Sequence, residues 1–344
     1  MFDADAAPAI AAHIDAAASL AALCESAQRI DALVVQEHTS GTPAWRLAQH
    51  VGALNSRLFA RLWSLQAPPE WAAQTCLLVM GSEGRGEQIL KTDQDNALLL
   101  QDGVEFPGLE RIAQDFNAAL TELGYPRCPG DIMLTNPLWR QPLTAFMETI
   151  RGWRHGPAAG GDGPMHLAIF FDAAVVAGDA TLLQRARAHL RAVLSDNDTY
   201  LARFVAAADQ FHEPGHWFSR LLPHHDEVLL DLKKLGTFPI VHGVRALSLQ
   251  YGVNEPGTLA RLEQLAAHKR LGQARADELA DALKALMQVR LGHQLRQRQR
   301  GEVPGNELRP STLEPAERVL LRDALAVVKD FRQFLRLHYQ LDLL

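Results

Sequence analysis

Cysteine is scarce in this sequence of 344 residues: its three cysteines, Cys24, Cys76 and Cys128, lie far apart and follow no spacing typical of metal or redox sites. Such a pattern indicates reduced thiols. Uninterrupted apolar runs approaching the roughly 20 residues needed to span a bilayer are absent as well. The amino terminus carries acidic residues but no lysine or arginine, unlike a secretory signal. We therefore predict a cytoplasmic protein that does not bind membranes.

Positive charge is not in excess either, because 34 lysines and arginines are set against 40 aspartates and glutamates, giving a net charge of −6. This balance argues against a large non-specific nucleic-acid surface. The arginine-rich stretch 290–300, RLGHQLRQRQR, could contact RNA, but a solvent-exposed helix end explains it equally well. It contains no aromatic residue for stacking on bases. Nucleic acid is therefore not expected as a partner.

What the sequence does contain is ordinary for a globular protein, with 47% hydrophobic and 22% charged residues and hence a sizeable core. Its length allows two domains, or one domain with a helical appendage. Apolar residues at helical spacing predict helices over 7–36 and 43–65. From residue 196 onward the pattern is helical throughout, with helices expected at 198–212, 226–235, 239–251, 256–270, 274–299 and 314–339.

The most informative stretch runs from residue 77 to 100 and reads LLVMGSEGRGEQILKTDQDNALLL. Four apolar residues predict a short buried strand that enters a glycine-rich turn at Gly81 and Ser82. Ser82 is a good N-cap for a short helix from Glu83 to Leu90. Free amides at the start of such a helix favour a phosphate group. The first half of the stretch therefore predicts a phosphate-binding turn.

Two aspartates, Asp93 and Asp95, open the next apolar run. We expect them on a strand, where alternate side chains point to the same face. Two carboxylates held together on a buried sheet repel each other and lose hydration, which is costly unless a cation offsets it. Mg²⁺ suits such a site because it prefers oxygen ligands and lets phosphate oxygens complete its octahedron. A plain strand–turn–strand with a solvated acidic turn is the simpler alternative.

Gly-Ser followed after about ten residues by Asp-x-Asp resembles the DNA polymerase β-type nucleotidyltransferase superfamily. The fuller pattern GSEGRGEQ…TDQDNA is more similar to nucleotidyltransferases related to the PII-protein uridylyltransferase, and the resemblance extends over about residues 45–340. It implies an α+β fold, in which a polymerase β-like mixed sheet with helices follows a helical leader and precedes an all-α domain. We expect these three parts over 1–70, 71–195 and 196–344.

This superfamily needs a third carboxylate, on a strand adjacent to the Asp-x-Asp strand, and Asp172 fits that role. It lies in an apolar segment that predicts a core strand, where a lone acid is costly without a partner. Asp179 is the competitor, but it follows Gly178 and looks like the N-cap of a helix from 181 to 194. The resemblance implies that Asp93, Asp95 and Asp172 together hold two Mg²⁺ ions.

Basic side chains are expected to add positive charge around the nucleotide. Arg85 and Lys91 flank the glycine-rich turn, and Arg85 is the better candidate because its planar fork can grip two phosphate oxygens. Glu87 would orient Arg85 or cap the helix. The resemblance adds Lys233, in a Leu-Asp-x-Lys stretch, and Arg140, in an Asn-Pro-x-Trp-Arg stretch, as residues on the nucleotide or acceptor side. A solvated helix face is the alternative for Lys233.

The implied activity is transfer of a nucleoside monophosphate from a nucleoside triphosphate to a hydroxyl of an unidentified acceptor, with release of pyrophosphate. The enzyme would be uridylyl- or adenylyltransferase-like, and its acceptor a protein, such as a signalling protein, or a small molecule. Two alternatives come from other classes: a nucleotide-binding regulator without turnover, and a protein-interaction module with a vestigial acidic pair. His224, His225 and Asp226 resemble part of a phosphohydrolase metal site, but a helix cap at Asp226 explains them better.

Overall fold

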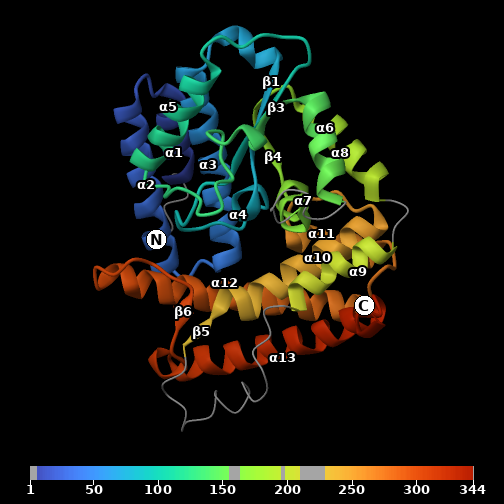
Figure 1. Ribbon diagram of the computed structural model, residues 1–344. Helices are drawn as coiled ribbons and strands as arrows, with labels where there is room; N and C mark the ends of the chain where they lie inside the picture. The colour runs from blue at the N-terminus through green and yellow to red at the C-terminus, as the bar shows by residue number, and fades with distance from the viewer. Residues whose placement is uncertain (1–5, 155–162, 195–197, 210–228, 344) are drawn as a thin grey trace. The chain divides into compact units, whose positions relative to one another are not determined.

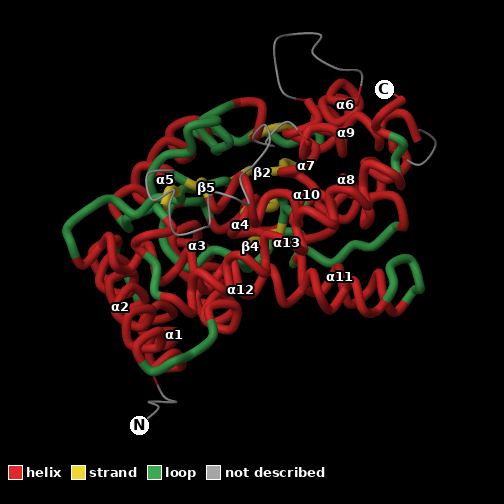
Figure 2. The backbone as a smooth tube through the Cα atoms, turned by 90° about the horizontal axis from the view of Figure 1, so that it is seen from below, coloured by secondary structure: helices red, strands yellow, loops and turns green. Residues whose placement is uncertain are grey.

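The computed structural model describes residues 6–154, 163–194, 198–209 and 229–343. The chain divides into two compact units, Met1–Val193 and Leu194–Leu344. The first unit combines helices with a small sheet, and the second consists mainly of helices (Figure 1). Figure 2 shows how little strand there is beside the helices. Among the described residues, no helix is both long and apolar enough to cross a membrane.

Three helices open the first unit: α1 (Ala6–Ala16), α2 (Leu20–Thr39) and α3 (Ala44–Gln66). The single helix predicted over 7–36 is therefore two helices, because Ser19 starts a new one by accepting a hydrogen bond from the Ala22 amide at 3.3 Å. The apolar stripe predicted along α3 is buried at Leu47, Val51, Leu54, Leu58 and Leu62. These helices form the leader of the chain, and they belong to the same unit as the sheet.

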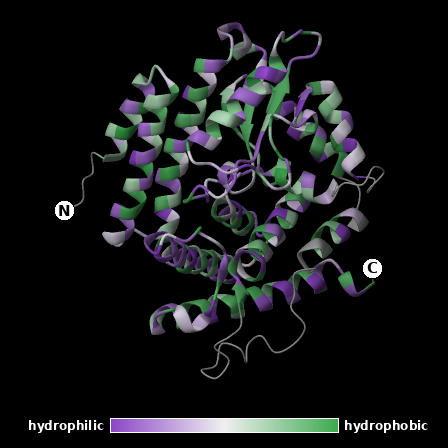
Figure 3. Ribbon diagram, turned by 60° about the vertical axis from the view of Figure 1, so that its left-hand side comes forward, coloured by the Kyte–Doolittle hydropathy of each residue, from purple (hydrophilic) through white to green (hydrophobic). Residues whose placement is uncertain are grey.

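The sheet of the first unit has four strands: β1 (Thr75–Val79), β2 (Asn96–Leu100), β3 (Arg140–Pro142) and β4 (Ala174–Gly178). Their order is β3-β2-β1-β4, with β1 antiparallel to β2 and β4, and β2 parallel to β3. Every residue of β1 and β2 is buried, so both strands read as continuous apolar runs, and Figure 3 colours the sheet mainly as hydrophobic. The predicted mixed sheet and α+β class are confirmed.

The register of the sheet brings three chain segments to one edge. Val79, the last residue of β1, lies opposite Asn96 at the start of β2 and opposite Ala174 at the start of β4. The glycine-rich turn that follows β1, the two aspartates that precede β2 and Asp172, which precedes β4, therefore emerge at the same edge. Antiparallel pairing on both sides of β1 is the cause of this convergence.

Helices cover the sheet on both sides. In Figure 1, α1, α2, α3 and α5 (Leu109–Glu122) lie on one side of the strands, and α6 (Leu143–Arg154) and α8 (Ala180–Leu194) lie on the other. At the start of α8, the carboxylate of Asp179 accepts a hydrogen bond from the Thr181 amide at 2.9 Å. The prediction that Asp179 caps this helix is therefore confirmed.

Two predictions about the segment around Asp172 are wrong. The apolar run before it forms a helix, α7 (Gly163–Phe171), and the strand begins only at Ala174. A short, continuously apolar run does not distinguish a buried helix from a buried strand, which is why the pattern misled. In addition, β4 pairs with β1 and not with β2, so Asp172 is not next to the strand that follows the two aspartates.

The second unit contains the helices α9 (Asp198–Asp209), α10 (Phe238–Tyr251), α11 (Thr258–Ala267), α12 (Gln273–Gln299) and α13 (Pro315–His338). The helix predicted over 226–235 is wrong at its described start, where Leu230–Asp231 forms β5, paired with β6 (Glu307–Leu308). From Leu232 the chain is helical, and Lys233–Thr237 forms a π-helical turn that leads into α10. The Asp231 carboxylate favours this turn by accepting from the amides of Lys233 and Lys234. The domain expected to be all-α thus includes a two-stranded sheet.

Two sequence features of the second unit need separate mention. Arg296 pairs with Glu317 at 3.0 Å and Arg300 with Glu302 at 2.7 Å, so part of the arginine-rich stretch is neutralised inside the unit. The stretch 224–226, with its two histidines and aspartate, lies outside the described residues.

Candidate functional site

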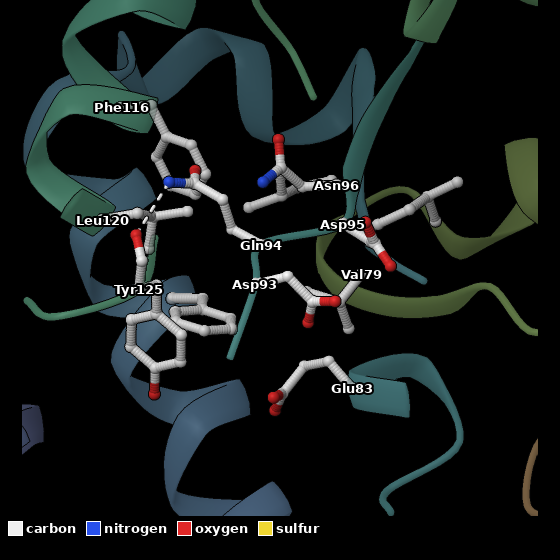
Figure 4. A pocket seen from close by; sticks show the side chains of 12 residues that line it. Val79, Glu83, Asp93, Gln94, Asp95, Asn96, Phe116, Leu120 and Tyr125 are labelled. Carbon is white, nitrogen blue, oxygen red and sulfur yellow. Dashed lines mark hydrogen bonds between the residues drawn. The ribbon is translucent and has the colours of Figure 1, made fainter. Parts of the chain in front are cut away.

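The acidic segment, residues 93–96, lines a pocket together with residues of α3, β1 and α5 (Figure 4). Regular strand begins only at Asn96, so Asp93 and Asp95 lie just before β2 and not within it. The alternation expected of a strand is nevertheless kept, because Gln94 and Asn96 are buried whereas Asp93 and Asp95 are half-buried. Figure 4 shows the two carboxylates on the side away from the two amides.

A buried amide network, formed by Gln94, Asn96 and Asn117, holds the other face of the acidic segment. Asn117, on α5, donates its side-chain amide to Gln94 Oε1 at 2.7 Å and to Asn96 Oδ1 at 3.0 Å. Gln94 in turn donates to the carbonyl oxygen of Tyr125 at 3.0 Å. None of the three residues was predicted from the sequence, although two amides alternating with aspartates before an apolar strand are a visible signal for the first two.

The glycine-rich turn, residues 81–91, begins with Gly81, whose φ of +56° lies in the left-handed region. A Cβ at this position would lie 2.4 Å from Asp95 Oδ2. A Cβ at Gly84 would lie 2.3 Å from the carbonyl oxygen of Asp172. Because both positions lack a side chain, Asp95 and Asp172 can approach the backbone of the turn closely.

The helix predicted from Glu83 to Leu90 is wrong, since the turn contains only the short α4 (Gly81–Gly84), and its N-cap is Met80. Instead of capping a helix, the Ser82 hydroxyl donates to Gln88 Oε1 at 2.7 Å. Gln88 then donates its own amide to the carbonyl oxygen of Asp93 at 3.2 Å. The two hydrogen bonds link the glycine-rich turn to the acidic segment through a residue that was not predicted.

Arg85 joins the glycine-rich turn to Asp172 by an ion pair. Its guanidinium contacts Asp172 Oδ2 at 2.6 Å and Glu87 Oε2 at 2.6 Å, and the Asp172 side chain is fully buried. Burial lowers the pKa of Arg85, but the Glu87 and Asp172 carboxylates more than offset this and raise it. The expected pairing of Glu87 with Arg85 is confirmed, and the structure places the arginine between two carboxylates.

The other predicted basic residues lie in separate places. Lys91 Nζ contacts Asp31 Oδ2 of α2 at 2.8 Å and donates to the Ala27 carbonyl oxygen at 3.0 Å. Arg140 donates to the carbonyl oxygen of Leu134 at 2.6 Å, and burial lowers its pKa. Lys233 is an exposed residue of the second unit. The structure therefore attaches Lys91 to the helical leader and Arg140 to the loop before β3.

Glu83 is a further acidic group of the same pocket. It accepts a hydrogen bond from Asn55 Nδ2 of α3 at 3.3 Å, and Asn55 Oδ1 accepts one from the Tyr125 hydroxyl at 2.7 Å. Burial raises the pKa of Glu83 to about 8; the Asn55 hydrogen bond opposes this shift and the Asp93 charge adds to it. Asn55 could have been suspected from the sequence, because it is a polar residue within the apolar face of α3.

Cys128 lies next to the acidic segment. Burial raises the pKa of its thiol to about 12, and the charge of Asp95 and a hydrogen bond with it contribute to the rise. A thiol with so high a pKa is almost entirely protonated near neutral pH and hence a poor nucleophile. Cys128 is therefore a neutral neighbour of Asp95.

A divalent cation fits the described side chains in part. Asp93 and Asp95 offer carboxylate oxygens, the ligand type that Mg²⁺ prefers. Asp172, the predicted third ligand, instead binds Arg85. Among the described residues, no group of three or more His, Cys, Asp or Glu side chains is arranged to hold a metal ion. Asp93 and Asp95 remain the candidate ligands.

Two family models match the chain. Residues 28–159 match the model described as "Putative nucleotidyltransferase DUF294", and residues 198–339 match the one described as "Putative nucleotidyltransferase substrate binding domain". The chain belongs to this nucleotidyltransferase family. The first match contains the glycine-rich turn and the acidic segment, whereas Asp172 lies outside both matched ranges. No curated protein matches the chain significantly. The predicted resemblance to a nucleotidyltransferase with a helical carboxyl-terminal domain is confirmed.

Proposed function

We propose that this member of the nucleotidyltransferase family is a metal-dependent enzyme. It transfers a nucleoside monophosphate from a nucleoside triphosphate to a hydroxyl of a protein, such as a signalling protein, or of a small molecule, and releases pyrophosphate. With UTP as the donor the enzyme is uridylyltransferase-like, and with ATP it is adenylyltransferase-like. The observation that carries the proposal is the approach of the Asp95 carboxylate to the backbone of the glycine-rich turn at Gly81.

Asp93 and Asp95 are the proposed ligands of two Mg²⁺ ions. Such ions stabilise charge on the phosphates and lower the pKa of an attacking hydroxyl. Asp172 is the proposed third ligand, and its Oδ2 must first be released by Arg85. The protein's own contribution is to hold the acidic segment and the turn in fixed positions, since phosphoryl transfer depends mainly on positioning and electrostatics.

Gly81 and Ser82 are the proposed contacts for the β- and γ-phosphates, through backbone amides and the hydroxyl. Arg85 and Lys91 already bind carboxylates of the protein, which leaves them less charge to offer a phosphate. Arg85 regains this charge once it releases Asp172. Arg140 and Lys233 are the further proposed basic residues on the nucleotide or acceptor side. Lysine or arginine placed near a departing pyrophosphate stabilises the charge that develops on it.

The proposal can be tested by thermal unfolding with ATP, GTP, CTP and UTP in turn, with and without Mg²⁺. A ligand at about 100 times its Kd adds roughly 2.7 kcal/mol of stability, which is visible as a shift in Tm. We expect a Mg²⁺-dependent shift for at least one nucleotide, and its loss in Asp93→Asn/Asp95→Asn. The matched control removes two exposed charges of α5, Asp115→Asn/Glu122→Gln, and should keep the shift.

An absent shift with all four nucleotides would overturn the proposal. A shift that survives in Asp93→Asn/Asp95→Asn would show that the acidic pair does not hold the metal and its nucleotide. If the nucleotide binds as expected, release of labelled pyrophosphate in the presence of candidate acceptors measures turnover directly.

A second candidate function is nucleotide binding without transfer. The observation in its favour is the Arg85–Asp172 ion pair, which takes up the carboxylate expected as the third metal ligand. This regulator would show the same Mg²⁺-dependent Tm shift as the enzyme. It would release no pyrophosphate with any acceptor, and Asp172→Asn would leave its nucleotide affinity unchanged.

A further inference from the structure

The amide network is almost completely shielded from solvent: Gln94, Asn96 and Asn117 are 4%, 2% and 0% exposed. Both hydrogens of the Asn117 amide are used, one on Gln94 and one on Asn96. Its Oδ1 accepts from the Thr135 amide at 3.1 Å. Each bond fixes which way an amide faces, because a reversed amide would bring two donors or two acceptors together.

Further bonds tie the network to the chain on either side. Asn96 Oδ1 also accepts from the Leu134 amide at 2.9 Å, and Gln94 Nε2 reaches the Thr121 hydroxyl at 3.3 Å. A buried polar group that loses its partner is costly, whereas an apolar replacement of the whole network need cost little. Such a network adds less to stability than to the uniqueness of one geometry.

The acidic segment needs this support because it precedes the regular strand. The backbone of Asp95 is held by a hydrogen bond from the Met80 amide at 2.9 Å, and the backbone of Asp93 by the Gln88 side chain at 3.2 Å. Side chains alternate along an extended segment, so the orientation of Gln94 and Asn96 fixes the orientation of the residues between and beside them. Figure 4 shows the two amides directed toward α5 and the two carboxylates directed away from it.

We propose that Asn117 is a positioning residue of this site: through Gln94 and Asn96 it sets the direction in which Asp93 and Asp95 point. The importance of this positioning for catalysis rests on the proposed function, whereas the orienting of Asp93 and Asp95 by Asn117 does not. Groups that do not bind the metal but orient its ligands typically change metal affinity by about 10- to 100-fold when they are lost. Asn117 lies 22 residues beyond Asp95 in the sequence and acts only through the network.

The test compares two substitutions at Asn117 with a control on the same helix. Asn117→Asp keeps the shape and the acceptor for Thr135 but replaces both donated hydrogen bonds with repulsion between oxygens. Asn117→Ala removes the same donors without burying a charge. The control, Leu123→Ala, removes buried apolar volume at the end of α5 and leaves the network intact. It is chosen to lower the Tm by a similar amount.

Two measurements are made on each folded variant, well below its Tm. Electron paramagnetic resonance of free Mn²⁺ gives the affinity for Mn²⁺ alone, used in place of Mg²⁺. The rate of iodoacetamide alkylation of Cys128, resolved from the other thiols by peptide mass spectrometry, reports the position of the neighbouring Asp95. We expect both Asn117 variants to bind Mn²⁺ about tenfold more weakly and to alkylate Cys128 at a changed rate. Leu123→Ala should change neither.

The proposal is overturned if Leu123→Ala shifts both readouts as much as the Asn117 variants do, or if the Asn117 variants leave the Cys128 rate at the wild-type value. A wild-type protein that binds no Mn²⁺ would instead count against the proposed function. In that case the Cys128 rate still decides whether Asn117 positions the acidic segment, so the two failures are distinguishable.

Discussion

The glycine-rich turn and the acidic segment are neighbours that hold their charged residues in opposite ways. In the turn, Arg85 binds Glu87 and Asp172, and Lys91 binds Asp31, so positive and negative charges are matched inside the protein. In the acidic segment, the groups that fix Asp93 and Asp95 are neutral amides. The turn is therefore built as a stable frame, and the acidic segment as a place where added positive charge is favourable.

The largest effect is expected from breaking the charge matching of the turn. Arg85→Gln removes the guanidinium that pairs with the buried Asp172 carboxylate, and loss of one partner of a buried pair typically costs about 3–5 kcal/mol. The free energy of unfolding in urea measures this. The double variant Arg85→Gln/Asp172→Asn should recover much of the loss. Arg111→Gln, which breaks an exposed pair on α5, should change stability little.

The next effect concerns Glu83 and pH. Its pKa is raised from 4.5 to about 8, so between these values the folded protein binds more protons than the unfolded chain. The stability contributed by the protonated carboxyl is full below pH 4.5 and is lost as pH rises through about 8. Glu83→Gln mimics the protonated form. The free energy of unfolding of this variant minus that of wild type should therefore be larger at pH 9 than at pH 5, by roughly 2–4 kcal/mol.

Urea titrations of both proteins across this pH range would measure the difference. A constant gap between Glu83→Gln and wild type would show that the carboxyl is not held protonated in the folded protein. Glu70→Gln, at an exposed carboxylate outside the pocket, is a suitable comparison.

A smaller effect is expected from neutralising the acidic segment. In the absence of metal, Asp93→Asn should stabilise the protein by about 1 kcal/mol, because one of several close carboxylates is removed. It should also lower the pKa of Glu83, which the Asp93 charge raises. The pH series on Asp93→Asn checks both expectations. If this variant is destabilised as strongly as Arg85→Gln, the contrast between the two regions is wrong.

The smallest effect concerns the thiol beside Asp95. Asp95→Asn removes a negative charge that raises the pKa of Cys128, so the thiolate fraction and the alkylation rate at pH 8 should rise several-fold. Burial remains the larger cause of the raised pKa, and the rate will stay well below that of an exposed thiol. Peptide mass spectrometry after iodoacetamide treatment gives the rate. An unchanged rate would mean that the Asp95 carboxylate does not face Cys128.

Local patterns in the sequence predicted the parts of the fold that local forces determine. The apolar stripe of α3, the buried runs of β1 and β2 and the long helices of the second unit are examples, because periodicity and punctuation by glycine and proline specify them directly. The apolar run of α7 was wrongly predicted as a strand because it has no period that distinguishes a helix from a strand. Family resemblance supplied the assignment to the nucleotidyltransferases.

The contacts of the site were less predictable because they join distant parts of the chain. Arg85 and Asp172 are 87 residues apart, and Asn55 lies 28 residues before Glu83. Nothing in the vicinity of Asn117 indicates that its amide orients Gln94 and Asn96. Such pairings depend on the order of the strands and on which helix covers them. The metal ligands, the donor nucleotide and the acceptor therefore remain predictions.

The hydrogen bond from Asn55 to Glu83 and the ion pair of Lys91 with Asp31 give the helical leader a direct part in the site. A shortened protein that starts at residue 71 would lose the donor that holds Glu83 and the carboxylate that holds Lys91. Removing the leader would therefore do more than uncover apolar surface. Conversely, a partner that shifts α3 would pull on the Glu83 end of the glycine-rich turn, and a partner that shifts α2 would pull on its Lys91 end.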